Sequence, residues 1–123
     1  MNFNDYQPIY LQIMDYFKYK IIRGELQSNE KVPSVRDVSS HLKVNPNTVQ
    51  RSFQELNKEG IIYSQRGLGN FVTTDDKVLK NLKVTKGKEI ISNFYKEINS
   101  LGLSEEECFQ LLREEWKRHE QPN

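Results

Sequence analysis

Residues 34–60 restrict the fold more than any other part of the chain, because two short helices must fit there with almost no linker. Ser34 is a favoured N-cap, and Asn45 followed by Pro46 is a favoured helix start, so each helix has its own start signal. Only the sequence KVN separates the two helices, and Gly60 ends the second. Two helices joined by so short a turn are typical of a helix-turn-helix motif.

The segments on either side of this motif extend the pattern. An apolar stripe predicts a helix from about Pro8 to Arg23, and a short extended piece follows it before Pro33. After the motif, residues 61–65 and 71–74 read as two strands, joined by a glycine-rich turn of about four or five residues. The order of helix, short strand, helix, helix and hairpin is that of a winged helix-turn-helix.

Residues 75–123 read as two further helices, which we expect to form a separate segment from a DNA-binding domain at residues 1–74. The first of them is polar in its early part, where Gly87 interrupts the pattern, and Ser104 with Glu107 forms a capping box before the second. The predicted fold is therefore mainly α with a small β-hairpin: a winged helix-turn-helix followed by a two-helix dimerisation segment.

The helix that starts at Asn45 has an apolar stripe on one side and hydrogen-bonding side chains on the other. Asn47, Gln50 and Arg51 point roughly away from the stripe, with Thr48 at its flank. A solvated surface is the plain explanation for such residues. DNA recognition is favoured over it, because these residue types bond to base edges and phosphates, and because they stand at the helix end that enters the major groove.

Two more arginines lie where such a fold meets a duplex. Arg66 sits at the hairpin tip beside Gly67 and Gly69, which supply turn geometry and would also let the backbone come close to a phosphate. Arg36 lies in the first turn of the first helix of the motif. It is either a surface charge paired with an acid such as Asp37 or a clamp on the DNA backbone.

Large apolar side chains are too numerous in the tail for two antiparallel helices to bury by themselves. Burying one such side chain is worth roughly 1.5–3 kcal/mol, so a partner surface is expected. The first helix of the chain could cover part of them, but a homodimer is favoured, because two-fold symmetry is the commonest assembly and suits palindromic DNA. The residues predicted to form the dimer interface are Ile91, Phe94, Tyr95, Ile98, Phe109, Leu112 and Trp116.

The stretch from Pro8 to Val72 resembles the DNA-binding domain of GntR-family transcriptional regulators. PIYLQI is similar to the family's first-helix signature, and the sequence from Lys31 onward is similar to its helix-turn-helix and wing almost without a gap. The family often has arginine at the position of Gln50 and usually has alanine at that of Ser52. Together with the patterns above, the resemblance implies a DNA-binding surface formed by Ser34, Arg36, Asn45, Asn47, Thr48, Gln50, Arg51, Arg66, Gly67 and Gly69.

The short tail is similar to that of the YtrA subfamily, in which it serves dimerisation, whereas most GntR-family members carry a large sensing or aminotransferase-like domain. The resemblance implies a transcriptional regulator, in the first place a repressor, that binds a palindromic operator in double-stranded DNA as a homodimer. Subfamily members often control operons that encode ABC transporters, so such an operon is the implied target. The alternative is a winged-helix adaptor that binds proteins without specific DNA binding.

Composition argues against several other classes of protein. The net charge of +1 argues neither for nor against nucleic-acid binding, so any DNA binding has to come from a local basic patch. A single cysteine, Cys108, cannot form an internal disulfide, and neither a membrane span nor a signal peptide is visible, so a cytoplasmic protein is expected. We see no catalytic pair, phosphate loop, cofactor motif or metal spacing; no enzyme, cofactor or metal is expected, and nothing specifies a small-molecule effector.

Overall fold

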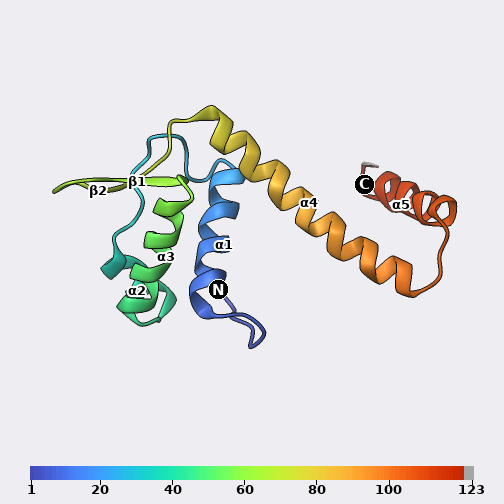
Figure 1. Ribbon diagram of the computed structural model, residues 1–123, viewed down its shortest axis with the longest axis horizontal. Coiled ribbons are helices and arrows are strands. Elements are labelled where there is room, and N and C mark those ends of the chain that lie inside the picture. Colours follow the sequence, from blue (N-terminus) through green and yellow to red (C-terminus); the bar gives the residue numbers. More distant parts are fainter. Residues whose placement is uncertain (121–123) are drawn as a thin grey trace. The chain divides into compact units, whose positions relative to one another are not determined.

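The computed structural model describes residues 1–120, and its helices and hairpin follow the predicted order (Figure 1). The short strand expected before residue 34 is reduced to an isolated bridge between Lys31 and Phe71. In chain order the elements are α1 (Ile9–Ile22), α2 (Val35–Leu42), α3 (Pro46–Lys58), β1 (Ile62–Gln65), β2 (Gly69–Val72), α4 (Asp76–Ser100) and α5 (Glu105–Glu120). The fold class predicted from the sequence is confirmed. Residues 121–123, which end the predicted tail, lie outside the described part of the chain.

The chain divides into two compact units, unit 1 (Met1–Val84) and unit 2 (Thr85–Asn123). The division falls inside α4, so this helix contributes to both units. Helix α4 runs without a break through Gly87, where the sequence pattern is interrupted, because one glycine costs a helix only about 1 kcal/mol. The assignment of a DNA-binding role to residues 1–74 and of dimerisation to residues 75–123 stays a prediction.

The core of unit 1 lies between α1, α3 and the hairpin. Ile13 of α1 and Leu56 of α3 are completely buried, and the rings of Phe17 and Phe53 meet edge to face with centroids 5.4 Å apart. Val72 of β2 is also completely buried, so the hairpin closes one side of this core. The apolar stripes predicted for α1 and α3 are therefore the faces that hold unit 1 together.

The turn between α2 and α3 is tied by three residues close in sequence. Lys43 adopts the left-handed conformation, with φ of 57°, which is uncommon for a residue other than glycine. The amide of Val44 donates to the carbonyl of Ser39 at 3.1 Å, and the Ser39 hydroxyl donates to the carbonyl of Val44 at 2.5 Å. These two bonds hold the connector in the shape that a helix-turn-helix requires.

The hairpin turn is shorter than predicted. Gly69 pairs with Gln65, so only residues 66–68 form the loop, whereas the sequence suggested four or five residues. The strand begins two residues earlier than predicted, and this is possible because Gly69 adopts φ of 109°, which side chains disfavour. The predicted extended piece before α2 lies along β2, where the amide of Val32 donates to the carbonyl of Asn70 at 2.8 Å.

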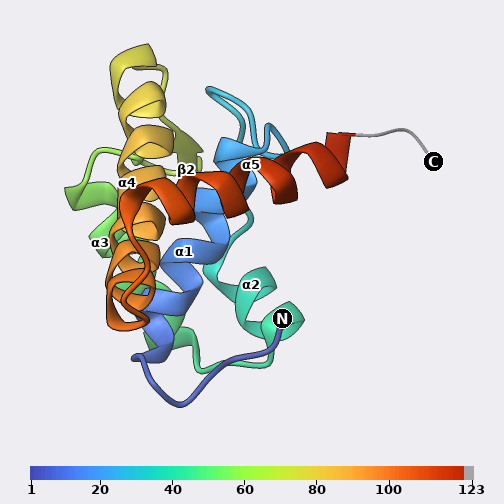
Figure 2. The ribbon, with the colours of Figure 1, turned by 90° about the vertical axis from the view of Figure 1, so that its right-hand side faces the viewer.

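The N-terminal segment loops out beyond the start of α1 before it enters that helix (Figure 2). Gln12, which is buried in α1, holds this loop with both ends of its amide. Its nitrogen donates to the carbonyl oxygens of Asn4 and Gln7 at 3.0 and 2.9 Å, and its oxygen accepts from the amide of Asn4 at 2.9 Å. Across residues 1–120, no helix combines the length and apolar character of a membrane span.

Candidate nucleic-acid interface

The first two turns of α3 carry side chains that the sequence assigns to DNA. The Asn45 side-chain oxygen accepts a hydrogen bond from the amide of Asn47 at 2.8 Å, as predicted for an N-cap. Asn47, Gln50 and Arg51 are exposed, whereas Thr48 is half-buried. The predicted polar face of α3 is therefore accessible, and the Asn45 side-chain oxygen is used by the helix start itself. The DNA-binding role of these residues stays a prediction.

Arg51 is exposed, but its guanidinium rests on an aromatic ring. Arg51 Cζ lies 3.7 Å from the ring centroid of Tyr10, which belongs to the first turn of α1. No hydrogen bond or ion pair of the Arg51 side chain is found within residues 1–120. Nothing local in the sequence signals this contact, because Tyr10 and Arg51 are far apart along the chain.

Arg36 stands at the exposed start of α2. Ser34 begins this helix as predicted, since its hydroxyl accepts a hydrogen bond from the amide of Asp37 at 3.1 Å. Arg36 makes no ion pair with Asp37 in the described structure, so pairing with that acid does not account for it. A contact between Arg36 and a DNA phosphate stays a prediction.

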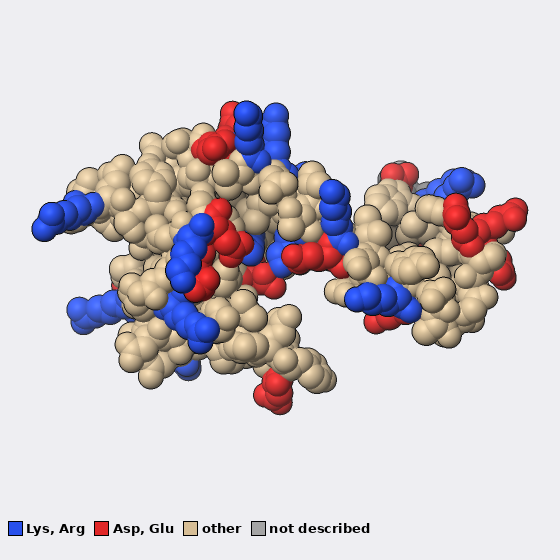
Figure 3. Space-filling model, in the orientation of Figure 1, with Lys and Arg blue, Asp and Glu red and all other residues tan. Residues whose placement is uncertain are grey.

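Arg66 and Gly67 form the exposed tip of the hairpin, as predicted. In the view of Figure 3, a basic side chain projects from the hairpin end with no acidic side chain around it, and other basic side chains project over α2. Gly69 lies in β2 rather than at the tip, which corrects its predicted place in the turn. A side chain there would begin 3.3 Å from Lys31 Cε, so Gly69 serves strand geometry and packing as well as any approach to DNA.

A small polar network joins the hairpin to α3. Asn57 Nδ2 donates to the carbonyl of Phe53 at 2.9 Å and to Asn70 Oδ1 at 3.2 Å. The Ser64 hydroxyl donates to the same Asn70 oxygen at 2.7 Å. Sequence reasoning missed this network, because its members look like ordinary surface residues until β1 and β2 are paired. The network fixes the hairpin at a set position relative to α3.

Ser52 joins α3 to α1. Its hydroxyl is completely buried and lies 2.9 Å from the carbonyl oxygen of Tyr10 and 3.1 Å from that of Thr48. An alanine at this position, as the resembled family usually has, would lack the bond to α1. Ser52 therefore ties the backbone that carries Tyr10 to the helix that carries Arg51.

The acidic side chains of α3 and its C-cap are paired with lysines rather than with the predicted DNA-contacting arginines. Glu55 Oε1 lies 3.2 Å from Lys58 Nζ, and Glu59 Oε1 lies 3.0 Å from Lys18 Nζ of α1. Within the described part of the chain, Arg36, Arg51 and Arg66 form no ion pair. Their charges are thus available to an external anion.

The apolar side chains of unit 2 are largely exposed. None of residues 85–120 is buried; Ile91 is 66% exposed and Trp116 64%. Phe94, Tyr95 and Phe109 are exposed as well, while Ile98, Leu112 and Cys108 are half-buried. The predicted interface residues therefore lie on accessible surface, and their part in a dimer stays a prediction.

Hydrogen bonds organise the two ends of α5. At its start, the Ser104 amide donates to Glu107 Oε1 and the Glu107 amide donates to Ser104 Oγ, each at 3.1 Å, which confirms the capping box. The hydrogen bond from the Ser104 amide, followed by the effect of the Ser104 hydroxyl, lowers the pKa of the Glu107 carboxyl. Near the other end, bonds from Arg118 and then His119 lower the pKa of Glu115, and Glu115 in turn raises the pKa of Arg118.

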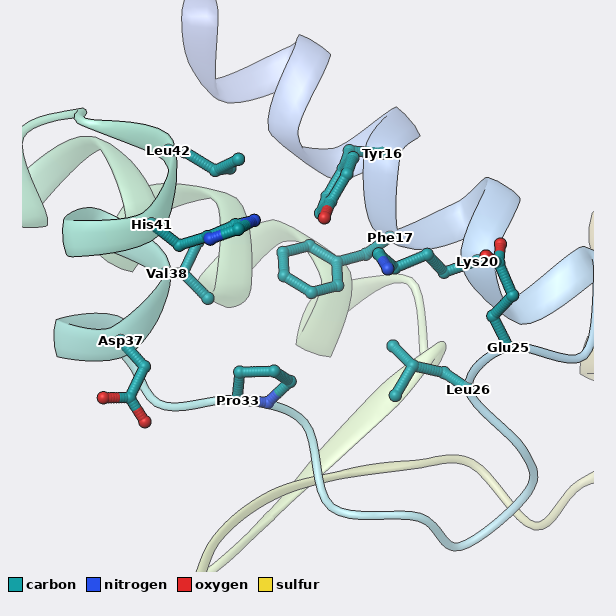
Figure 4. A pocket seen from close by; sticks show the side chains of 10 residues that line it. All are labelled: Tyr16, Phe17, Lys20, Glu25, Leu26, Pro33, Asp37, Val38, His41 and Leu42. Carbon is teal, nitrogen blue, oxygen red and sulfur yellow. The ribbon is translucent and has the colours of Figure 1, made fainter. Parts of the chain in front are cut away.

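A hollow in unit 1 lies between α1, α2 and the loop that joins them (Figure 4). Phe17 and Leu26 contribute apolar surface, and Lys20, Glu25 and His41 contribute polar groups. Because the lining carries both positive and negative charges, it does not select an effector of one charge. Among the described residues, no three His, Cys, Asp or Glu side chains are placed to hold a metal ion.

Comparisons with known proteins agree on one group. Residues 9–72 match the family model "Bacterial regulatory proteins, gntR family". The chain is 39% identical over 111 residues to the HTH-type transcriptional regulator YhcF of Bacillus subtilis strain 168, covering 90% of this chain and 92% of YhcF. It is 32% identical over 108 residues to the HTH-type transcriptional repressor YtrA of the same organism, covering 87% of this chain and 83% of YtrA.

Solved structures give the same result for the fold. A GntR family transcriptional regulator from Listeria monocytogenes superimposes with a TM-score of 0.86 and 35% identity, covering 91% of this chain and 98% of that one. A transcriptional regulator from Oenococcus oeni superimposes with a TM-score of 0.77 and 28% identity, covering 93% and 95%. The similarity extends beyond the winged helix-turn-helix, because these alignments include most of both chains.

Proposed function

This chain belongs to the gntR family of bacterial regulatory proteins, DNA-binding transcriptional regulators, and on that premise we propose that it is a repressor that binds a palindromic operator as a homodimer. The observation that carries the proposal is the set of three arginines without ion pairs in the described structure: Arg36 on α2, Arg51 on α3 and Arg66 at the hairpin tip. Similarity to the repressor YtrA supports the direction of regulation.

Each part of the proposed interface has its own task. Asn47, Gln50 and Arg51 at the start of α3 enter the major groove and contact base edges. Arg36 and Arg66 neutralise phosphates on either side and so set the position of the protein on the duplex. The network through Asn57 keeps the hairpin at a fixed place relative to α3, so that both contacts form together.

The homodimer in the proposal is supported by unit 2. Its described residues bury no apolar side chain, although several large ones are present. A second copy of the same surface would remove these groups from water, and each would contribute roughly 1.5–3 kcal/mol if fully covered. Two-fold symmetry then brings two copies of α3 to the two halves of a palindrome.

We further propose that the regulator acts in the cytoplasm, where its operator lies, and that it controls an operon encoding an ABC transporter. The support for the operon is the resemblance of the short tail to the YtrA subfamily, together with the identity to YtrA. No effector is part of the proposal.

Sequencing of genomic DNA retained by the purified protein tests the operator directly. We expect enrichment of palindromic sites, including one upstream of transporter genes, and an affinity that falls steeply with salt because phosphates are neutralised. Recovery of random fragments only would contradict specific DNA binding and would favour the protein-binding adaptor.

Fluorescence anisotropy with a recovered site then tests the assignment of base contacts. Arg51→Ala should weaken binding to the site by about 1–3 kcal/mol and binding to a scrambled duplex by less. An equal loss on both duplexes would make Arg51 a phosphate contact. Lys58→Ala on the same helix is the matched control, since Lys58 is paired with Glu55.

A further inference from the structure

The contact between Arg51 and Tyr10 gives α1 a part in DNA recognition. The guanidinium carbon of Arg51 is 3.7 Å from the centre of the Tyr10 ring, which is close contact between two flat groups. Among the described residues, the Arg51 side chain has no hydrogen bond or ion pair, so the contact with the Tyr10 ring restrains its guanidinium. By contrast, Arg66 at the hairpin tip has no ring contact in the same part of the chain.

Tyr10 is itself held firmly. Its carbonyl oxygen is 2.9 Å from the completely buried Ser52 hydroxyl, and Ser52 directly follows Arg51 in α3. Two residues further along α1, Gln12 holds the preceding loop with three hydrogen bonds. The ring therefore sits on backbone that is fixed both to α3 and to the N-terminal segment.

An arginine that contacts a ring through its flat face keeps its hydrogen-bond donors available. The N–H groups of a guanidinium lie in its plane, whereas attraction to the ring acts above and below that plane. A side chain held in this way loses less conformational entropy when it binds, because much of its freedom is already restricted. The contact thus favours DNA binding rather than competing with it.

We propose that Tyr10 is a positioning residue for DNA recognition, which holds Arg51 so that the edge of its guanidinium meets the operator. This inference rests on the proposed function. It adds a residue of α1 to a recognition surface otherwise formed by α2, α3 and the hairpin. It also gives the Ser52 hydroxyl a role, because that hydroxyl sets the distance between the ring and Arg51.

Anisotropy measurements on Tyr10 and Arg51 variants test the inference with operator and scrambled duplexes. Tyr10→Leu should weaken operator binding about threefold to tenfold and scrambled binding by less, because the contact with the ring is lost. Tyr10→Phe keeps the ring and should bind as the unaltered protein does. In an Arg51→Ala background, Tyr10→Leu should have no further effect; an equal additional loss would overturn the inference, since Tyr10 would then act through packing alone.

Side-chain NMR of the unaltered protein without DNA gives a test that does not depend on the folding of any variant. The Arg51 Nε–H group should be less mobile than that of Arg66 and shifted by the Tyr10 ring current. Equal mobility and no ring-current shift would overturn the inference, even if operator binding is specific. A different outcome is a restrained Arg51 side chain together with equal affinity for operator and scrambled duplexes. That result would contradict specific DNA binding, and with it the proposal that Tyr10 positions Arg51 for recognition.

Discussion

Unit 1 and unit 2 contain the same kinds of large apolar side chains but treat them in opposite ways. Phe17 and Phe53 of unit 1 are each 2% exposed, whereas Phe94 and Trp116 of unit 2 are 39% and 64% exposed. Unit 1 covers its apolar faces with α1, α2, α3, the start of α4 and the hairpin. Unit 2 has only part of α4 and α5, and two helices cannot cover each other on all sides. Unit 1 therefore has an apolar core of its own, while unit 2 leaves its apolar side chains on accessible surface.

The largest effect should follow from a change on that surface. Trp116→Ser removes one indole ring from each protomer. If both rings are fully covered in the proposed dimer, the substitution should weaken dimerisation by on the order of 3–6 kcal/mol. Sedimentation equilibrium would measure this as a shift toward monomer. Glu114→Ser in the same helix is the matched control and should leave the dimer intact. A monomeric unaltered protein at micromolar concentration would contradict this account of unit 2.

A change in the core of unit 1 should have the next largest effect, and on folding rather than assembly. Phe53→Ala should lower the free energy of unfolding by about 3–5 kcal/mol, because it leaves a cavity against Phe17. The half-exposed Phe109 is its counterpart in unit 2, and Phe109→Ala should destabilise the monomeric protein far less. Urea unfolding followed by circular dichroism would compare them. Equal losses would mean that the tail has a core of its own.

The hairpin gives a smaller test within unit 1. Asn57→Ala removes the two hydrogen bonds that the half-buried Asn57 side chain donates to Phe53 and Asn70, and it should lower the free energy of unfolding by about 1–3 kcal/mol. Operator affinity should fall as well, because the hairpin is no longer tied to α3. Lys58→Ala, which breaks only an exposed ion pair, should cost less than about 1 kcal/mol. Unchanged operator affinity in Asn57→Ala would mean that the network does not position the hairpin for DNA.

What could be predicted from the sequence depends on how far apart the interacting residues are. The caps at Ser34 and Asn45 were predictable because each side chain bonds to an amide two or three positions later. The stripe through Val49 and Phe53 was predictable because helical periodicity places such residues on one face. Local patterns therefore supplied the order of elements and the exposed face of α3.

Contacts between distant residues could not be predicted in this way. The hairpin register depends on whether Gly69 joins the strand, and Lys31, which lies beside Gly69, comes from another segment of the chain. The ring beneath Arg51 comes from α1, and the partner of Asn57 comes from β2. Sequence patterns could thus indicate which candidate side chains reach the surface, but not which neighbours hold them in place.

The smallest effect should be a loss of stability at low pH, and we expect it at the start of α5 in unit 2. Ser104 holds the Glu107 carboxylate at the start of α5 and lowers its pKa, so the charged form stabilises the folded helix. A lowered folded-state pKa gives stability that is present above the unfolded-state pKa, about 4.3, and is lost as pH falls through the folded-state value. The start of α2 lacks such a carboxylate bond in the described structure; there Ser34 only accepts from an amide.

NMR titration of the Ser104 amide in the whole chain would measure this effect. The Ser104 amide should shift as acid protonates Glu107, and Glu107→Gln, which can still accept a hydrogen bond, should remove that step. Glu115 also has a lowered pKa, and its titration affects stability in the same direction. Because Glu115 is present in both the unaltered protein and the Glu107→Gln variant, the difference between them reports on Glu107. A step at Ser104 that persists in Glu107→Gln would show that another group titrates there. The protonation of Glu107 would then have no effect on the start of α5.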